Sequence, residues 1–141
     1  MSKLNYDQLA QEALRGVVVQ ILKHVEENGM TKRDCIRITF IPTLKGVTCP
    51  PKLAKEYING LCIEFQEDKY ENLKVGHDRF SVDLYIGDAT EHFIVPFKAI
   101  SNIVDPDAQF GLEFEVDIAS AENLPDNVIS LDAFRKNKNY T

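Results

Sequence analysis

The sequence lacks any apolar run long enough to cross a membrane, and the acidic residues Asp7 and Glu12 interrupt its N-terminal region. A membrane-spanning helix needs about 20 mainly apolar residues, and a secretory signal needs an unbroken apolar stretch near the N-terminus. We therefore expect a cytoplasmic protein with no membrane partner. A length of 141 residues suits one domain with its own core.

The sequence also has no excess of basic residues over acidic ones. The chain has 16 Lys and Arg against 22 Asp and Glu, which gives a formal net charge of −6. Domains that bind nucleic acid usually carry a basic face, because they must attract the phosphate backbone. The charge balance therefore argues against a nucleic-acid partner.

Cysteines are few and far apart, namely Cys35, Cys49 and Cys62. An odd number without a CxxC pair forms neither a complete disulfide framework nor a usual metal or redox motif. We expect three reduced thiols.

Motifs of catalysis and cofactor binding are absent as well. The sequence has no Walker loop, no GxGxxG motif and no GxSxG elbow. The histidines, His24, His77 and His92, are widely separated and show no recognised metal-ligand spacing. We predict no catalytic residue, no metal and no cofactor. An enzyme with a carboxylate pair would need an enclosed cleft holding two convergent acids.

One amphipathic helix is the clearest element of the pattern, and we expect it over residues 7–28. Its apolar residues recur at steps of three and four, namely Ala10, Ala13, Leu14, Val17, Val18, Ile21, Leu22 and Val25. Asp7 is a favourable N-cap type, and Gly29 favours an end to the helix. Gly16 lies mid-helix, where Gly costs about 1 kcal/mol relative to Ala. Two explanations for a glycine at this position stay open: the close approach of another helix, or simple tolerance of the glycine by the helix.

Alternation of apolar and polar residues predicts five antiparallel strands within residues 35–116. Their approximate ranges are 36–40, 61–66, 80–86, 90–96 and 110–116. Gly87-Asp88 predicts a tight hairpin, and Pro50-Pro51 predicts the start of a short connecting helix. These elements predict an α+β fold in which the N-terminal helix packs outside a small curled β-barrel.

The strand pattern ends near Asp117, and we expect residues 117–141 to form a flexible tail beyond a folded domain of residues 1–116. Such a polar composition cannot offset an ordering entropy of roughly 1 to 2 kcal/mol per residue. An apolar and basic island lies within the tail, namely Val128, Ile129, Leu131, Phe134, Arg135 and Lys136. Islands of this kind often dock on a partner protein.

Four segments resemble the stringent starvation protein B family in its alphaproteobacterial form, in the same order along nearly the whole chain. They are DQLAQEALRGVV (7–18), RITF (37–40), FIVPFKAISNIVDPDAQFGLEF (93–114) and VISLDAFRK (128–136). The resemblance implies a non-enzymatic adaptor that binds the ssrA tag on products of stalled ribosomes and delivers them to the ClpXP protease. It also implies an Sm-like barrel, and docking of the C-terminal island on ClpX.

The resemblance further implies a homodimer formed through the N-terminal helix. The residues that we expect at this dimer interface are Ala13, Gly16, Val17 and Ile21. An Sm-like barrel that binds RNA is the alternative function, although the sequence shows no basic stripe with interleaved aromatic residues.

The family's tag groove includes the segment after the second predicted strand, here FQEDKYENL (65–73). Gln66 looks like the glutamine that alphaproteobacterial members carry there, and its amide can both donate to and accept from an extended peptide. The rest of the segment departs from the family pattern, which leaves the tag preference open. Our candidate peptide-binding residues are Phe65, Gln66, Tyr70, Leu73, Phe97 and Ile100. Core packing is the alternative, above all for Phe97 and Ile100.

Overall fold

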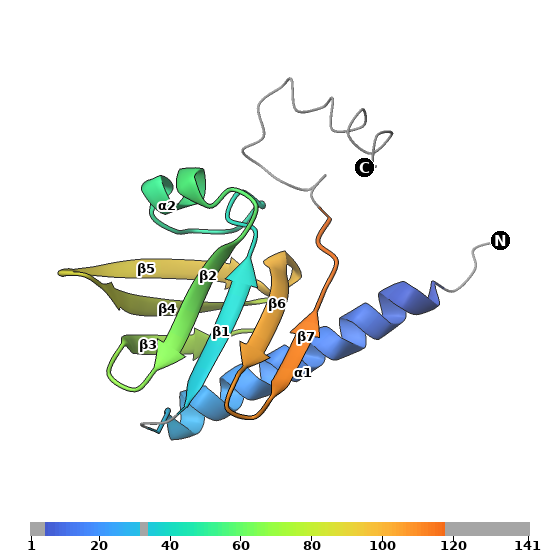
Figure 1. Ribbon diagram of the computed structural model, residues 1–141. Coiled ribbons are helices and arrows are strands. Elements are labelled where there is room, and N and C mark those ends of the chain that lie inside the picture. The colour runs from blue at the N-terminus through green and yellow to red at the C-terminus, as the bar shows by residue number, and fades with distance from the viewer. Residues whose placement is uncertain (1–4, 32–33, 118–141) are drawn as a thin grey trace.

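The computed structural model describes residues 5–31 and 34–117. Its helices are α1 (Tyr6–Asn28), α2 (Pro51–Glu56) and the short 3-10 helix η1 (Phe97–Ala99). Its strands are β1 (Cys35–Phe40), β2 (Leu61–Gln66), β3 (Tyr70–Val75), β4 (Arg79–Ile86), β5 (Ala89–Pro96), β6 (Ile100–Asp105) and β7 (Phe110–Glu113). One sheet has the order β2-β1-β6-β7 and the other β3-β4-β5, with α1 alongside (Figure 1). The α+β class is confirmed.

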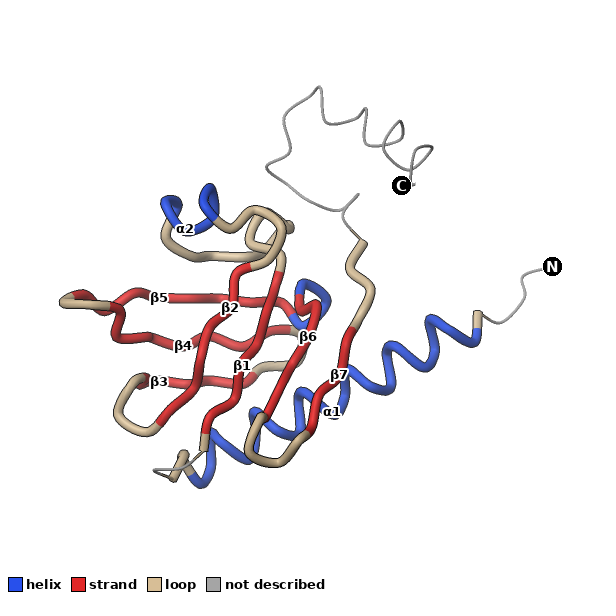
Figure 2. The backbone as a smooth tube through the Cα atoms, in the orientation of Figure 1, coloured by secondary structure: helices blue, strands red, loops and turns tan. Residues whose placement is uncertain are grey.

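The predicted barrel is wrong, because the two antiparallel sheets keep separate ladders and do not close (Figure 2). A short turn joins β2 to β3, in which the amide of Lys69 donates to the carbonyl oxygen of Gln66 at 3.0 Å. Beyond this turn β3 pairs with β4 and not with β2. The outer side of β2 is consequently an open edge of its sheet.

The described residues form seven strands, two more than the alternation predicted. β3 was missed because its sequence is mostly polar and its register shifts between Glu71 and Lys74, where Asn72 has a φ of 57°. β6 was missed because its fully buried positions, Ile100 and Ile103, are three residues apart instead of two. Both strands are irregular at the points where the period of two fails.

The N-terminal helix is confirmed, and its last residue, Asn28, matches the prediction. The N-cap is Asn5, whose side chain accepts from the amide of Gln8 at 3.0 Å, and not Asp7 as we predicted. Asp7 lies in the first turn, where a carboxylate interacts favourably with the helix dipole. Gly29 ends the helix at a φ of 75°, which Gly adopts without the steric cost of a side chain. No helix of the described residues combines the length and the apolar character needed to cross a membrane.

The core lies between the two sheets and α1. Phe40, Phe65, Phe80 and Phe93 are fully buried. Phe40 and Phe93 meet edge to face with ring centroids 6.4 Å apart, which joins β1 of one sheet to β5 of the other. Burying one such ring contributes about 1.5 to 3 kcal/mol, so these contacts fix how the two sheets face each other.

A clamp centred on Arg15 holds the chain after β7 against α1. The Nη2 atom of Arg15 donates to the carbonyl oxygens of Ile100 at 3.2 Å and Glu115 at 2.7 Å. The guanidinium lies 5.0 Å from the ring centroid of Phe114, and burial lowers the pKa of Arg15. Gln11 accepts from the amide of Glu115 at 2.8 Å. The last described residues therefore leave the domain beside the N-terminal half of α1.

Candidate functional site

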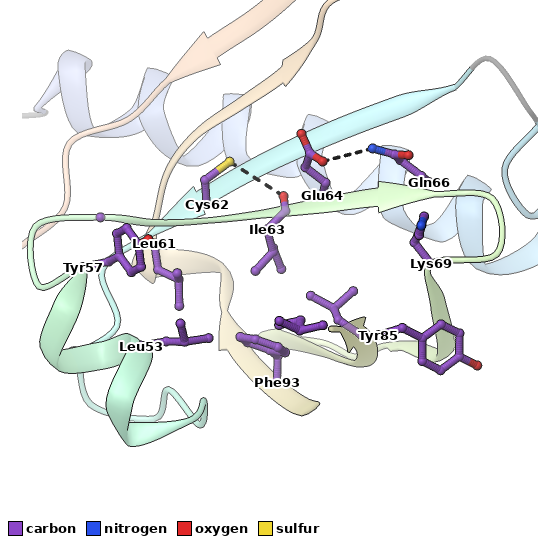
Figure 3. Close-up of a pocket in the computed structure, with 13 residues that line it drawn as sticks. Leu53, Tyr57, Leu61, Cys62, Ile63, Glu64, Gln66, Lys69, Tyr85 and Phe93 are labelled. Carbon is purple, nitrogen blue, oxygen red and sulfur yellow. Dashed lines mark hydrogen bonds between the residues drawn. The ribbon is translucent and has the colours of Figure 1, made fainter. Parts of the chain in front are cut away.

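A groove of about 840 Å³ lies where the open edge of β2 faces the β4–β5 hairpin (Figure 3). Leu53 and Tyr57, from α2 and the loop after it, lie at one end, while Lys69 and Tyr85 lie at the other. Its volume falls within the usual range for ligand sites, about 300 to 1,000 Å³. The groove occupies the place where the sheets fail to close, so it is a direct result of the open fold.

Apolar side chains form the floor and much of the rim of this groove. The floor residues Leu61, Ile63, Leu84 and Phe93 are all buried. The rim residues are large yet exposed, with exposed fractions of 47% for Tyr57, 40% for Tyr85 and 42% for Ile86. Apolar surface that gathers around a hollow is typical of a binding site.

Gln66 and Glu64 form a polar network along β2. The Nε2 atom of Gln66 donates to Oε1 of Glu64 at 3.0 Å and to Sγ of Cys35 at 3.8 Å. Arg37 of β1 holds the other Glu64 oxygen at 2.7 Å, so the charge of this carboxylate is compensated. The Gln66 amide oxygen accepts no hydrogen bond from the described residues, which leaves an acceptor available to a ligand.

Lys69 has a fixed main chain and a free charged end. Its amide bonds to Gln66, and its carbonyl oxygen accepts from the amide of Tyr85 at 3.1 Å. Its ammonium group forms no ion pair with any other residue in the described part of the chain. Lys69 thus gives its end of the groove a positively charged group that forms no ion pair among the described residues.

Tyr85 separates the groove from a second, smaller hollow lined by Gly29, Met30, Glu67, Asp68 and Tyr70. Its hydroxyl donates to Glu71 of β3, and this hydrogen bond raises the pKa of Tyr85. The bond crosses from β4 to β3 and restricts the rotation of the ring. Tyr85 is therefore a positioned aromatic surface rather than a loose side chain.

Of the six predicted peptide-binding residues, Gln66 alone lines the groove. Phe65 and Ile100 are fully buried, and Leu73 and Phe97 are nearly so, which places all four in the core. Tyr70 packs edge-on against Phe65 at 5.5 Å and lines the second hollow, and burial raises its pKa.

Sequence reasoning missed the groove residues other than Gln66, among them Tyr57, Lys69 and Tyr85. Tyr85 could have been found as an aromatic residue on the polar face of an alternating strand. Lys69 carried no such signal, because its place depends on the β2–β3 turn.

The predicted dimer residues lie on two sides of α1. Ala13, Gly16 and Val17 are exposed, whereas Ile21 is half-buried against the core. A side chain at Gly16 would meet nothing within 4 Å, so the chain itself makes no close approach there. The predicted protease-docking residues, Val128, Ile129, Leu131, Phe134, Arg135 and Lys136, lie outside the described residues.

The groove does not have the arrangement of an acid–base pair. Glu64 is the one carboxylate among the described residues that line it, and Arg37 already neutralises it. The described residues also contain no cluster of three or more His, Cys, Asp or Glu that could hold a metal ion. What the groove offers is recognition, through apolar surface, one amide and one cation.

The family model for stringent starvation protein B matches residues 8–137. Because this match covers most of the 141 residues, the chain belongs to the stringent starvation protein B family. A comparison with curated proteins finds no significant match. Membership of this family indicates an adaptor role in proteolysis rather than catalysis.

Proposed function

We propose that this protein binds the ssrA degradation tag in the groove beside β2 and delivers tagged proteins to the ClpXP protease. The observation that carries the proposal is a groove of about 840 Å³, with an open strand edge on one side and an apolar floor, in a member of this family. Extended peptides bind such sites through main-chain hydrogen bonds and alternate side-chain pockets.

In this proposal Gln66 orients the tag and the floor takes up its apolar side chains. The free amide oxygen of Gln66 supplies an acceptor, while Tyr57 and Tyr85 enclose the peptide from the two ends of the groove. Binding of this kind changes no covalent bond. It concentrates the substrate for another protein that does the chemistry.

The adaptor would act as a homodimer paired through the outer face of α1. The residues of this face are exposed and apolar over the first three turns, namely Tyr6, Leu9, Ala10, Ala13, Gly16 and Val17. The core-facing residues Val18, Leu22 and Val25 lie on the opposite side of the helix, so pairing would leave the core undisturbed. Ile21 supports the helix from the core side.

The C-terminal island, residues 128–136, would dock each subunit on ClpX. The clamp at Arg15 fixes where each C-terminal segment leaves the domain, beside the helices that would pair. Two segments on one dimer can bind together, and the second then meets its site at an effective concentration of the order of millimolar.

The direct test of tag capture is a fluorescence anisotropy titration with a labelled peptide of the source organism's own ssrA tag. We expect saturable binding with one peptide per chain, and none to a peptide of the same composition in scrambled order. Equal binding of both peptides, or no binding of either, would contradict the proposal.

A further inference from the structure

We propose that the second hollow is a subsite for a cationic side chain, a lysine or arginine of the substrate that lies just beyond the stretch held in the groove. This inference rests on the proposed function and deepens it, because it adds a site outside the groove and gives the charge of the residue that binds there. The hollow has a volume of about 380 Å³, at the lower end of the usual range for ligand sites. It therefore suits a single side chain better than a further stretch of peptide.

Two tyrosine rings form walls of this hollow, namely Tyr70 of β3 and Tyr85 of β4. The Tyr70 ring is held by its edge-to-face contact with Phe65, and the Tyr85 ring by the hydrogen bond from its hydroxyl to Glu71. The face of an aromatic ring is partly negative and attracts a cation that lies within about 6 Å of its centroid. Because both rings are already positioned, a cation that binds between them pays little to order them.

Carboxylates give the hollow a negative potential. Glu67 and Asp68, in the turn between β2 and β3, line it beside the two rings. The effect is felt at Tyr85, whose pKa is raised by the hydrogen bond to Glu71. The nearby charges of Asp83 and Asp68 act in the same direction, because negative charge close to a phenol disfavours the phenolate. The same potential favours a cation in the hollow and disfavours an acidic side chain.

The C-terminal end of α1 forms a further wall, since Gly29 and Met30, directly after the helix, line the hollow. The last carbonyl groups of a helix give this end a partial negative charge, which attracts cations. A helix often supplies such a cation itself, from a lysine or arginine in its last turn. The last turn of α1 has no basic residue and contains Glu26 and Glu27 instead. Helix end, carboxylates and rings thus all favour the same kind of ligand.

Tyr85 connects the hollow to the groove, because its side chain lines both. It lies at the end of the groove where Lys69 also lies (Figure 3). Lys69 belongs to the same turn as Glu67 and Asp68, but it lines the groove and not the hollow. A substrate chain that leaves the groove across the Tyr85 ring therefore brings its next side chain to the hollow. This continuity is what assigns the cation to the substrate.

The subsite is tested with two series of labelled peptides that contain the tag and its flanking residues. Each residue in turn is replaced by lysine or by norleucine, which has the same carbon chain without the ammonium group. We expect lysine to bind about three- to tenfold more tightly than norleucine at one end position, and by less at high salt. Binding of the peptides without any such position would overturn the inference and leave the proposed function standing. Failure of the unmodified tag to bind would overturn both.

The place of the subsite is tested with the double variant Glu67→Gln and Asp68→Asn. Asp107→Asn with Glu113→Gln is the matched control, because it changes the net charge equally at exposed residues outside the groove and the hollow. We expect the first variant to lose most of the lysine preference and the control to keep it, with the norleucine peptide bound equally by both. An equal lysine preference in the two variants would overturn the assignment to this hollow.

The contribution of the ring is tested with Tyr85→Phe and Tyr85→Leu. Phenylalanine keeps an aromatic face and loses only the hydroxyl, whereas leucine has no aromatic face. We expect Tyr85→Phe to keep most of the lysine preference and Tyr85→Leu to lower it by about two- to fivefold. A full preference in Tyr85→Leu would overturn the role of the ring.

The basic end of the chain itself is the competing occupant. The full chain carrying Arg135→Gln, Lys136→Gln and Lys138→Gln removes this competitor. We expect it to show the same lysine preference as the wild type. A preference that appears only in this variant would mean that the chain's own basic end fills the hollow, and would overturn the assignment to the substrate.

Discussion

At the scale of single residues, Gln66 is the one predicted tag-binding residue whose side chain lines the groove in the structure. We predict that Gln66→Ala weakens tag binding by roughly 2- to 13-fold, since it removes one hydrogen bond worth about 0.5 to 1.5 kcal/mol. Gln20→Ala, on the exposed face of α1, is the matched control. Anisotropy titrations measure both, and an unchanged affinity for Gln66→Ala would place the tag elsewhere.

Arg15 offers a residue-scale prediction about stability instead of binding. Arg15→Met keeps an apolar stem against Phe114 but leaves the carbonyl oxygens of Ile100 and Glu115 without their donor. We expect a loss of about 1.5 to 3 kcal/mol in the free energy of unfolding, measured by urea denaturation. Arg79→Met is the control, because its pair with Asp78 is local and exposed, and such pairs contribute at most about 1 kcal/mol. Equal losses in both variants would show that the clamp does not stabilise the fold.

At the scale of elements, the outer face of α1 changes character along its length. Its first three turns are apolar, whereas Gln20, His24 and Glu27 continue the same face with polar side chains. We predict that Val17→Glu gives a monomer by light scattering at micromolar concentration, because it would bury a charge in the dimer seam. His24→Glu puts the same charge in the polar half and should leave the dimer intact. A monomeric wild type would contradict helix pairing.

The elements also show what could be predicted from sequence. α1 and the regular strands followed from periods of 3.6 and 2, since each has one buried face. β3 has a single buried residue, Leu73, and a bulge, so it carries no period that could be recognised. The candidate site was predictable at Gln66 alone. The rest of the groove depends on how β2 and the β4–β5 hairpin face each other across the open side of the fold. No local sequence pattern encodes this arrangement of two elements that are distant in the chain.

At the scale of the whole molecule, the proposed function makes the protein a tether with two separable parts. In this proposal the groove holds the substrate, and residues 128–136 bring it to the unfoldase. A short segment that orders on binding holds weakly by itself, but two on one dimer gain avidity by about 10² or more. Groove variants should therefore change tag affinity, whereas changes to the C-terminal segment should change delivery alone.

The central claim is tested most directly by the rate at which purified ClpXP degrades a tagged substrate at limiting concentration, with the full chain or with a chain cut after Asp126. We predict that the full chain accelerates degradation and that the truncated chain binds the tag with unchanged affinity but gives no acceleration. The paired variant Leu131→Ala and Phe134→Ala should reproduce most of this loss, because it removes the two largest apolar side chains of the island. With saturating substrate the protease needs no adaptor, so all rates should converge. Undiminished acceleration by the truncated chain at limiting substrate would contradict the account.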